Sequence, residues 1–275
     1  MGSMFLVRHS ETSETMLEDD FTYVLRKALV GQGISSAEAA RRAGLAESDV
    51  SAFLGGTFSS RTARKIAPVL GLREDALAAH DTYQPRPVTL PDALRLDLPM
   101  GGEQVNAWLL RKDETLILFD AGYETSDLTE VLDSVCGRLP DRVFITHAHR
   151  DHIGALSYLL RAGVPVHAAG IADTIPMLPG DTVQCGPLAV RACDLSGHAV
   201  PALGFHVEGL TLPVLVTGDA LFAGSIGGCR TPDLYRLALR RLGEVLGPLS
   251  DATIILPGHG PATTLGEERA ANPFL

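Results

Sequence analysis

Apolar positions between Phe21 and about His80 recur at the spacing of amphipathic helices. The first stripe consists of Phe21, Val24, Leu25, Ala28 and Leu29 and ends at Gly31 and Gly33. Ser35 and Glu38 fit a capping box that begins a second helix over 36–43, and Gly44 ends it. A short helix around 50–54 follows. A last helix, capped by Ser59 or Ser60, holds Ile66, Val69 and Leu70 and ends at Gly71.

The pattern changes at Val88, after a proline-containing linker over 80–91. Short β-rich runs then predict strands over 94–98, 105–110, 115–119, 142–145, 164–167, 186–192, 205–207, 214–217 and 253–256. Helical spacing appears over 127–136, 153–160 and 232–246. Strands in groups with helices between them predict an α/β fold of two sheets, each covered by helices on its outer face. We expect a tail (1–20), a small all-α domain (21–84) and an α/β domain (85–275).

Composition narrows the class of protein. Of the 275 residues 45% are hydrophobic, which is enough for a large core, and the formal net charge is −10. That charge argues against a nucleic-acid coat or a membrane-surface protein, whose phosphate partners require Lys and Arg. The four cysteines form no C-x-x-C pair, and no stretch has the features of a signal peptide or a membrane span. A cytoplasmic protein without a membrane partner is expected.

The candidate chemistry begins directly after the run 142–145. His147, His149, Asp151 and His152 fall within six positions, at the carboxyl end of a predicted strand. Imidazole and carboxylate groups are the ligands that zinc and similar divalent ions prefer. The spacing and the strand–turn–helix context therefore predict a metal site rather than a solvated turn.

Three later residues occupy comparable positions. His198 follows a glycine turn, Asp219 follows the apolar strand 214–217, and His259 follows the buried strand 253–256. Each is a weak signal alone, but all three lie where a strand ends, at the edge where α/β proteins collect their sites. His9 and His80 match no motif, and His167 and His206 are interpreted as ordinary strand histidines.

Together the pattern H-x-H-x-D-H, His198, Asp219 and His259 resembles the metallo-β-lactamase fold superfamily across roughly 88–275. The resemblance implies an αββα sandwich that holds two divalent metal ions. It places His147, His149 and His198 on one ion, Asp151, His152 and His259 on the other, and Asp219 between both. Asp151 and Asp219 would then be the acidic groups of the catalytic centre, which uses a hydroxide shared by the two ions. Zinc is the first expectation from the ligand types, and iron or manganese would also fit.

The stretches 217–227 and 256–269 and the tail 272–275 look like the glyoxalase II branch, in its short prokaryotic form. That resemblance implies hydrolysis of a thioester such as S-lactoylglutathione. The loop 226–230 lacks the lysine and tyrosine that contact glutathione in longer members, which leaves Arg230 as either a substrate contact or a surface charge. A persulfide dioxygenase with one iron and a lactonase remain alternatives.

The region 21–80 resembles the helix-turn-helix domain of Cro and phage repressors. In that family the helix around 47–54 would enter the major groove, but here it opens with Glu47 and Asp49. Residues 1–84 hold 9 Lys and Arg against 11 Asp and Glu, a net charge of −2, whereas DNA readers carry a basic footprint. We therefore expect a docking or homodimerisation module. A transcriptional regulator with a ligand-sensing hydrolase-like domain is the alternative.

Overall fold

The computed structural model describes residues 16–275. Of the predicted tail only residues 16–20 lie within it, and His9 lies outside. The chain begins with a helical region: α1 (Phe21–Gln32), α2 (Ser36–Ala43), α3 (Glu47–Leu54), α4 (Ser60–Ile66) and α5 (Glu74–Ala79), with 3-10 turns η1 (Pro68–Leu70) and η2 (His80–Thr82). No helix among the described residues is both long and apolar enough to cross a membrane.

Within residues 16–275 the strands that follow form two six-stranded sheets and one short hairpin. The first sheet has the order β1 (Ala93–Met100), β2 (Glu103–Lys112), β3 (Thr115–Phe119), β4 (Arg142–Phe144), β5 (Val166–Ala168) and β6 (Ile175–Pro176). The second has the order β14 (Thr263–Thr264), β13 (Ile254–Pro257), β10 (Val214–Gly218), β9 (Leu203–Glu208), β8 (Leu188–Asp194) and β7 (Thr182–Cys185). The hairpin pairs β11 (Leu221–Phe222) with β12 (Ser225–Ile226).

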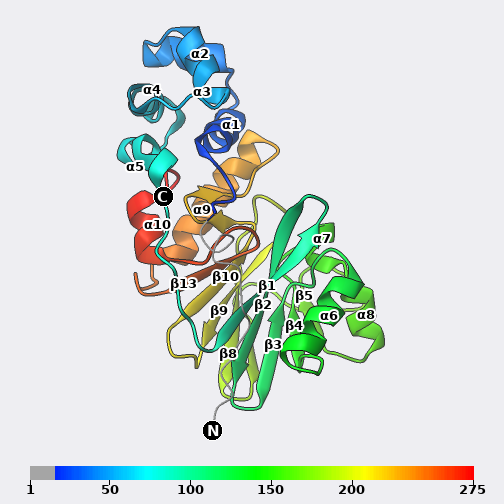
Figure 1. The fold of residues 1–275 in the computed structure, drawn as a ribbon. Coiled ribbons are helices and arrows are strands. Elements are labelled where there is room, and N and C mark those ends of the chain that lie inside the picture. The colour runs from blue at the N-terminus through cyan, green and yellow to red at the C-terminus, as the bar shows by residue number, and fades with distance from the viewer. Residues whose placement is uncertain (1–15) are drawn as a thin grey trace.

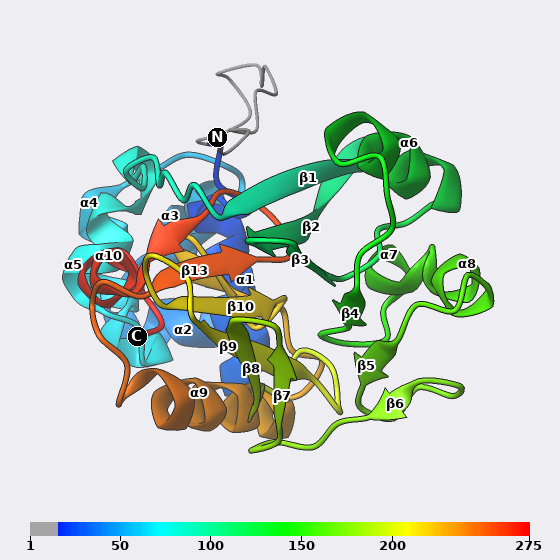
Figure 2. The same cartoon turned by 90° about the horizontal axis from the view of Figure 1, so that it is seen from below.

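The two sheets pack face to face, with helices outside both of them (Figures 1 and 2). Phe119 and Phe144 of the first sheet meet Phe205 of the second between them. The outer face of the first sheet is covered by α6 (Thr125–Val135), α7 (Arg150–Ile153) and α8 (Leu156–Arg161), and the second by α9 (Pro232–Leu246) and α10 (Leu265–Ala271). This is the predicted αββα sandwich.

Successive side chains along the central strands point to opposite faces of the sheet, which explains how each strand packs against two layers. In β13, Ile254 and Leu256 point between the sheets, whereas Ile255 points to the helices on the other face. In β10, Leu215 faces the same helices. Both strands are buried on both faces, so they appear in the sequence as continuous apolar runs.

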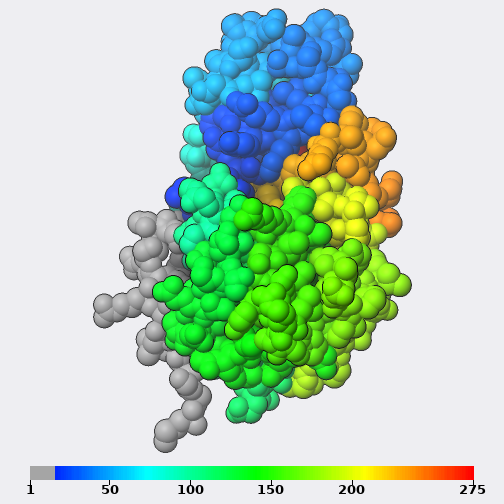
Figure 3. All heavy atoms as spheres, turned by 90° about the vertical axis from the view of Figure 1, so that its right-hand side faces the viewer, coloured from blue at the N-terminus to red at the C-terminus, as the bar shows by residue number. Residues whose placement is uncertain are grey.

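The helical region and the outer helices of the second sheet share one hydrophobic cluster. Leu25 and Phe53 belong to the same cluster as Tyr235 of α9 and Phe274 near the C-terminus. Figure 3 shows the helical region (blue) standing on the sandwich, in contact with the orange segment of α9. The backbone N–H of Arg73 also donates to the carbonyl of Pro273 at 2.8 Å. The boundary at 84/85 stays a prediction, but the core does not divide there.

The linker is packed as well. His80 is buried, and its Nε2 lies 2.9 Å from the carbonyl oxygen of Gly224. Tyr83 donates its hydroxyl hydrogen to Glu268 at 2.8 Å. Glu268 is buried and also accepts the backbone N–H of Gly224 at 2.8 Å. The linker is thereby joined to the β11–β12 hairpin and to α10.

Two predicted helices are wrong in extent. The helix expected up to Gly71 ends at Ile66, because Pro68 has no N–H for the next helical hydrogen bond, and η1 takes its place. The helix expected over 153–160 is split into α7 and α8. There Gly154 N–H donates to the carbonyl of Gly122 at 2.7 Å, and Ala155 N–H to that of Ala121 at 3.2 Å, so neither continues the helix.

Candidate metal centre

All seven predicted ligands lie at one edge of the sandwich, after the ends of strands. His147 follows β4, His149 is the N-cap of α7, and Asp151 and His152 lie in its single turn. His198 lies in the loop between β8 and β9, Asp219 directly follows β10, and His259 follows β13. The ends of four strands, β4, β8, β10 and β13, thus deliver side chains that are up to 112 positions apart in the sequence, from 147 to 259.

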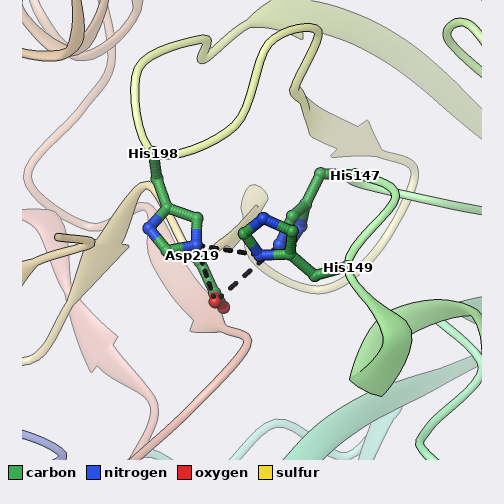
Figure 4. A group of neighbouring side chains, drawn as sticks. All are labelled: His147, His149, His198 and Asp219. Carbon is green, nitrogen blue, oxygen red and sulfur yellow. Dashed lines mark hydrogen bonds and ion pairs between the residues drawn. The ribbon is translucent and has the colours of Figure 1, made fainter. Parts of the chain in front are cut away.

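The first group contains His147, His149, His198 and Asp219 (Figure 4). One ligand atom of each lies within 4.8 Å of those of the others. His198 Nε2 is 3.1 Å from His149 Nδ1 and 3.5 Å from Asp219 Oδ2. His147 Nε2 is 3.8 Å from the same carboxylate oxygen. Three imidazole nitrogens and one carboxylate oxygen therefore face a common point, which suits a divalent ion.

The second group contains Asp151, His152, His259 and again Asp219. One ligand atom of each of these residues also lies within 4.8 Å of those of the others. His259 Nε2 is 3.3 Å from Asp151 Oδ2 and 3.6 Å from Asp219 Oδ2. His152 Nε2 is 3.3 Å from Asp219 Oδ1. Among the described residues, Asp219 is the member that the two groups share, so the cluster suggests a binuclear metal site.

Comparisons with known proteins agree with this geometry. The family model described as the Metallo-beta-lactamase superfamily matches residues 100–191. The probable metallo-hydrolase YqgX of Bacillus subtilis is 30% identical over 207 residues, which are 65% of this chain and 95% of that protein. The chain belongs to the metallo-beta-lactamase superfamily.

Two further proteins are similar to this chain. The hydroxyacylglutathione hydrolase GloC of Haemophilus influenzae is 30% identical over 204 residues, 65% of this chain and 96% of that protein. The crystal structure of TTHA1623 in a di-iron-bound form has a TM-score of 0.53 and 29% identity, and covers 65% of this chain and 99% of that one. The helical region lies outside the residues that the family model matches.

The ligand atoms that this metallo-beta-lactamase fold brings together in the two groups are suited to metal ions. Among the described residues, His147 Nε2, His152 Nε2 and Asp219 Oδ1 are buried and have no hydrogen-bond partner. A buried polar atom without a partner costs on the order of 1–3 kcal/mol. All three atoms point into the two groups, where a cation would satisfy them together. The cluster is therefore costly as a purely structural feature and suitable as a ligand set.

The first group is tuned to offer neutral imidazoles and a charged carboxylate. Burial lowers the pKa of His147 to about 2 and also lowers the pKa of His198. Burial opposes ionisation of Asp219, but the surrounding histidines outweigh it and hold the pKa of that carboxyl below its usual range. Metal ligands must be deprotonated to bind, and these three groups meet that condition near neutral pH.

In the second group the negative charges of the carboxylates, together with their hydrogen bonds, outweigh the effect of burial on the pKa values of the histidines. Burial lowers the pKa of His259, but the hydrogen bond to Asp151 and the charge of Asp219 outweigh it and raise this pKa to about 9. Burial likewise opposes protonation of His152, and the charges of Asp219 and Asp120 outweigh it, so its pKa lies above the ordinary value. The negative potential that raises both values is the field that attracts a cation.

Asp120 is a site residue that the sequence reasoning missed. It is buried directly after β3, with a positive φ of 63°, and its Oδ2 lies 2.8 Å from His152 Nδ1. Its Oδ1 accepts the backbone N–H of Thr146 at 2.8 Å. A carboxylate on the far nitrogen of a ligand histidine fixes the orientation and tautomer of its ring. The available signal is an acidic residue directly after a buried strand, and the sequence alone does not distinguish it from an ordinary strand end.

Backbone carbonyls hold two other ligand rings. His198 Nδ1 lies 2.8 Å from the carbonyl oxygen of Gly228, and His259 Nδ1 lies 2.9 Å from that of Gln104. In both rings the hydrogen bond leaves Nε2 to face its group. In the His147 ring the partner of Nδ1 is a side chain instead of a carbonyl, because Thr146 Oγ1 lies 3.0 Å from this nitrogen.

The remaining candidates lie elsewhere. Arg230 is exposed just before α9, and its contact with substrate stays a prediction. His167 and His206 lie in β5 and β9 and are strand histidines, as predicted. His167 stacks on Phe144 with ring centroids 5.0 Å apart, which explains its burial without a ligand role.

Proposed function

We propose that this chain is a binuclear metal-dependent hydrolase that cleaves thioesters, with S-lactoylglutathione or a related thioester as substrate. The observation that carries the proposal is the placement of Asp219, whose Oδ1 faces His152 at 3.3 Å while Oδ2 faces His198 at 3.5 Å. One carboxylate can thereby hold two ions side by side. The likeness to GloC, a hydroxyacylglutathione hydrolase, supports the thioester as the bond that is cleaved.

A pair of divalent ions held this way would lower the pKa of water and stabilise the negative charge that develops on the attacked carbonyl oxygen. The chain supplies the orientation. Asp219 sets the spacing of the two groups. Burial opposes ionisation of Asp151, but its contact with His259, at 3.3 Å from Oδ2, outweighs burial and lowers the pKa of this carboxyl, so that Asp151 offers a charged carboxylate to the second group. We propose zinc as the first candidate metal, and iron as the second because of the similarity to a di-iron-bound structure.

The alternatives within the superfamily differ in metal count and in the bond attacked. Two complete groups of four ligands support a binuclear hydrolase over a dioxygenase that uses one iron. A lactone carbonyl would suit the same centre as a thioester, so substrate assays must separate these two.

The decisive experiment combines metal counting with a substrate panel. Protein loaded with zinc or iron is assayed on S-lactoylglutathione, a simple thioester and an acyl-homoserine lactone, and oxygen uptake is followed with glutathione persulfide. We expect two metals per chain and turnover of thioesters, with His206→Ala as an active control. Two bound metals without thioester turnover would refute the thioesterase, and oxygen uptake with a single iron would establish the dioxygenase instead.

We further propose that the helical region docks on the catalytic part and does not read DNA. The helix that would enter the groove, α3, begins with Glu47 and Asp49 in its first turn, and these repel phosphates. A homodimer through this region stays a prediction that sedimentation analysis would check. Sequence-specific retention of DNA fragments at low salt would contradict the docking role and favour a regulator.

A further inference from the structure

The helical region reaches the candidate metal centre through Lys27 of α1. Its ammonium group forms an ion pair with Asp19 and donates a hydrogen bond to the carbonyl oxygen of Ile226 at 2.8 Å. The Lys27 side chain is 16% exposed and that of Asp19 is 5% exposed, so the pair is largely removed from solvent. Breaking such a pair leaves an uncompensated buried charge, and Lys27 is therefore held firmly in place.

The segment that Lys27 holds also contacts two candidate ligands. Gly228 lies two residues after Ile226, and its carbonyl oxygen is 2.8 Å from His198 Nδ1. A Cβ at Gly227 would lie 1.8 Å from the backbone oxygen of Asp219 and 3.0 Å from the Cβ of His198. A Cβ at Gly228 would meet the Cε of Lys27 at 3.7 Å. Residues 226–228 are thus enclosed between Lys27 and the first group of ligands.

A second path leads from Lys27 towards the other group. Its ammonium lies 5.2 Å from the centroid of the Phe222 ring, a distance at which a cation is attracted to the ring face. The Phe222 ring in turn meets the His259 imidazole nearly edge-on, with centroids 5.9 Å apart. This contact is looser than the hydrogen-bonded path to His198, so the effect of Lys27 should fall mainly on the first group.

We propose that Lys27 is a positioning residue for the metal centre. It fixes residues 226–228 so that the Gly228 carbonyl holds the His198 ring with Nε2 facing His149 and Asp219. Through this one side chain the helical region takes part in metal binding. The inference rests on the proposed binuclear centre and adds to it a residue from outside the sandwich, about 170 positions before its target.

The test compares metal binding in the paired variants. Lys27→Met alone leaves the buried Asp19 carboxylate unpaired, so Asp19→Asn/Lys27→Met is the decisive variant. Lys65→Met, which removes an exposed lysine of α4, is the matched control. Zinc affinities are measured by competition with a chromophoric chelator, and cobalt(II) spectra of His147→Ala and His259→Ala assign the bands of the two groups.

We expect the double variant to lose about tenfold or more in affinity at the first group, with a shifted cobalt spectrum, because loss of ligand orientation has costs of that size. The second group should change less, Lys27→Arg should restore most of the affinity, and Lys65→Met should match the wild type. A purely structural role for Lys27 would lower the melting temperature and leave both affinities and the spectrum unchanged. That outcome would overturn this inference while the thioesterase stood. Two bound metals without thioester turnover would refute the thioesterase while the affinities still decided the role of Lys27.

Discussion

Asp219 is the residue on which both ligand groups depend, since it contributes to each of them. We predict that Asp219→Ala loses both metals, whereas His259→Ala weakens the second metal more than the first. The reason is that His259 faces Asp151 and lies outside the first group. Metal content after gel filtration, with His206→Ala as the control, measures both effects. Equal loss of the two metals from His259→Ala would show that the ligands are divided wrongly.

For single residues, the sequence revealed candidate ligands of two kinds. Some lie close to one another along the chain, and others directly follow a predicted strand. His147, His149, Asp151 and His152 are adjacent, and the structure brings them together with the three later candidates. Their role as ligands stays a prediction that the metal analysis tests. Lys27 carried no such signal, because its hydrogen-bond partner Ile226 is 199 positions away and a lysine on a helix is usually interpreted as a solvated charge.

Among the elements, α1 and α9 make the tightest contact between the helical region and the sandwich. A Cβ at Gly31 of α1 would lie 2.3–2.5 Å from the ring of Tyr235 in α9. We predict that Gly31→Ala destabilises the protein by about 1–3 kcal/mol, because the buried ring must shift. Urea unfolding, evaluated with the slope of the transition, measures the change.

The matched control for that substitution lies in α9 itself. A Cβ at Gly243 would meet no atom within 4 Å. Gly243→Ala should therefore stabilise the protein by about 0.4–1 kcal/mol, since alanine restricts the unfolded chain. Equal effects of the two substitutions would mean that α1 does not depend on its contact with α9.

Helices with regular spacing and strands with a continuous apolar run could be predicted, whereas two-residue strands and interrupted helices could not. The helix over 232–246 agrees with α9 at both ends. The two-residue strands β6, β11, β12 and β14 are too short to show alternation, and α10 is only seven residues long. The break between α7 and α8 depends on hydrogen bonds to Gly122 and Ala121, which the local pattern cannot contain.

For the whole molecule, the shared hydrophobic cluster means that the helical region and the sandwich should unfold together. Trp108, the only tryptophan of the chain, lies in β2 of the sandwich, while the circular dichroism signal draws strongly on the helices. We predict coincident urea transitions by tryptophan fluorescence and by far-ultraviolet dichroism, as expected for one cooperative unit. Removal of residues 1–84 should produce aggregated protein in gel filtration. A separate early loss of dichroism would instead identify an independent helical domain.

The sequence indicated the change from helical spacing to short β-rich runs near Val88, but it did not indicate this shared core. Helix spacing shows that α1 has an apolar face, and it does not show what covers that face. Tyr235 and Phe274 could equally have been assigned to the core of the sandwich alone. Only the packing of chain ends more than 200 residues apart shows that they belong with Leu25.

That packing also affects how the protein is made on the ribosome. About 150 residues separate the end of α5 from the start of α9, so synthesis at 5–20 residues per second leaves a gap of roughly eight to thirty seconds. During that time the apolar face of α1 has no α9 to cover it. We therefore expect the newly made helices to bind holdase chaperones until α9 has been synthesised. Stalled chains that end before α9 should accumulate on such chaperones rather than fold.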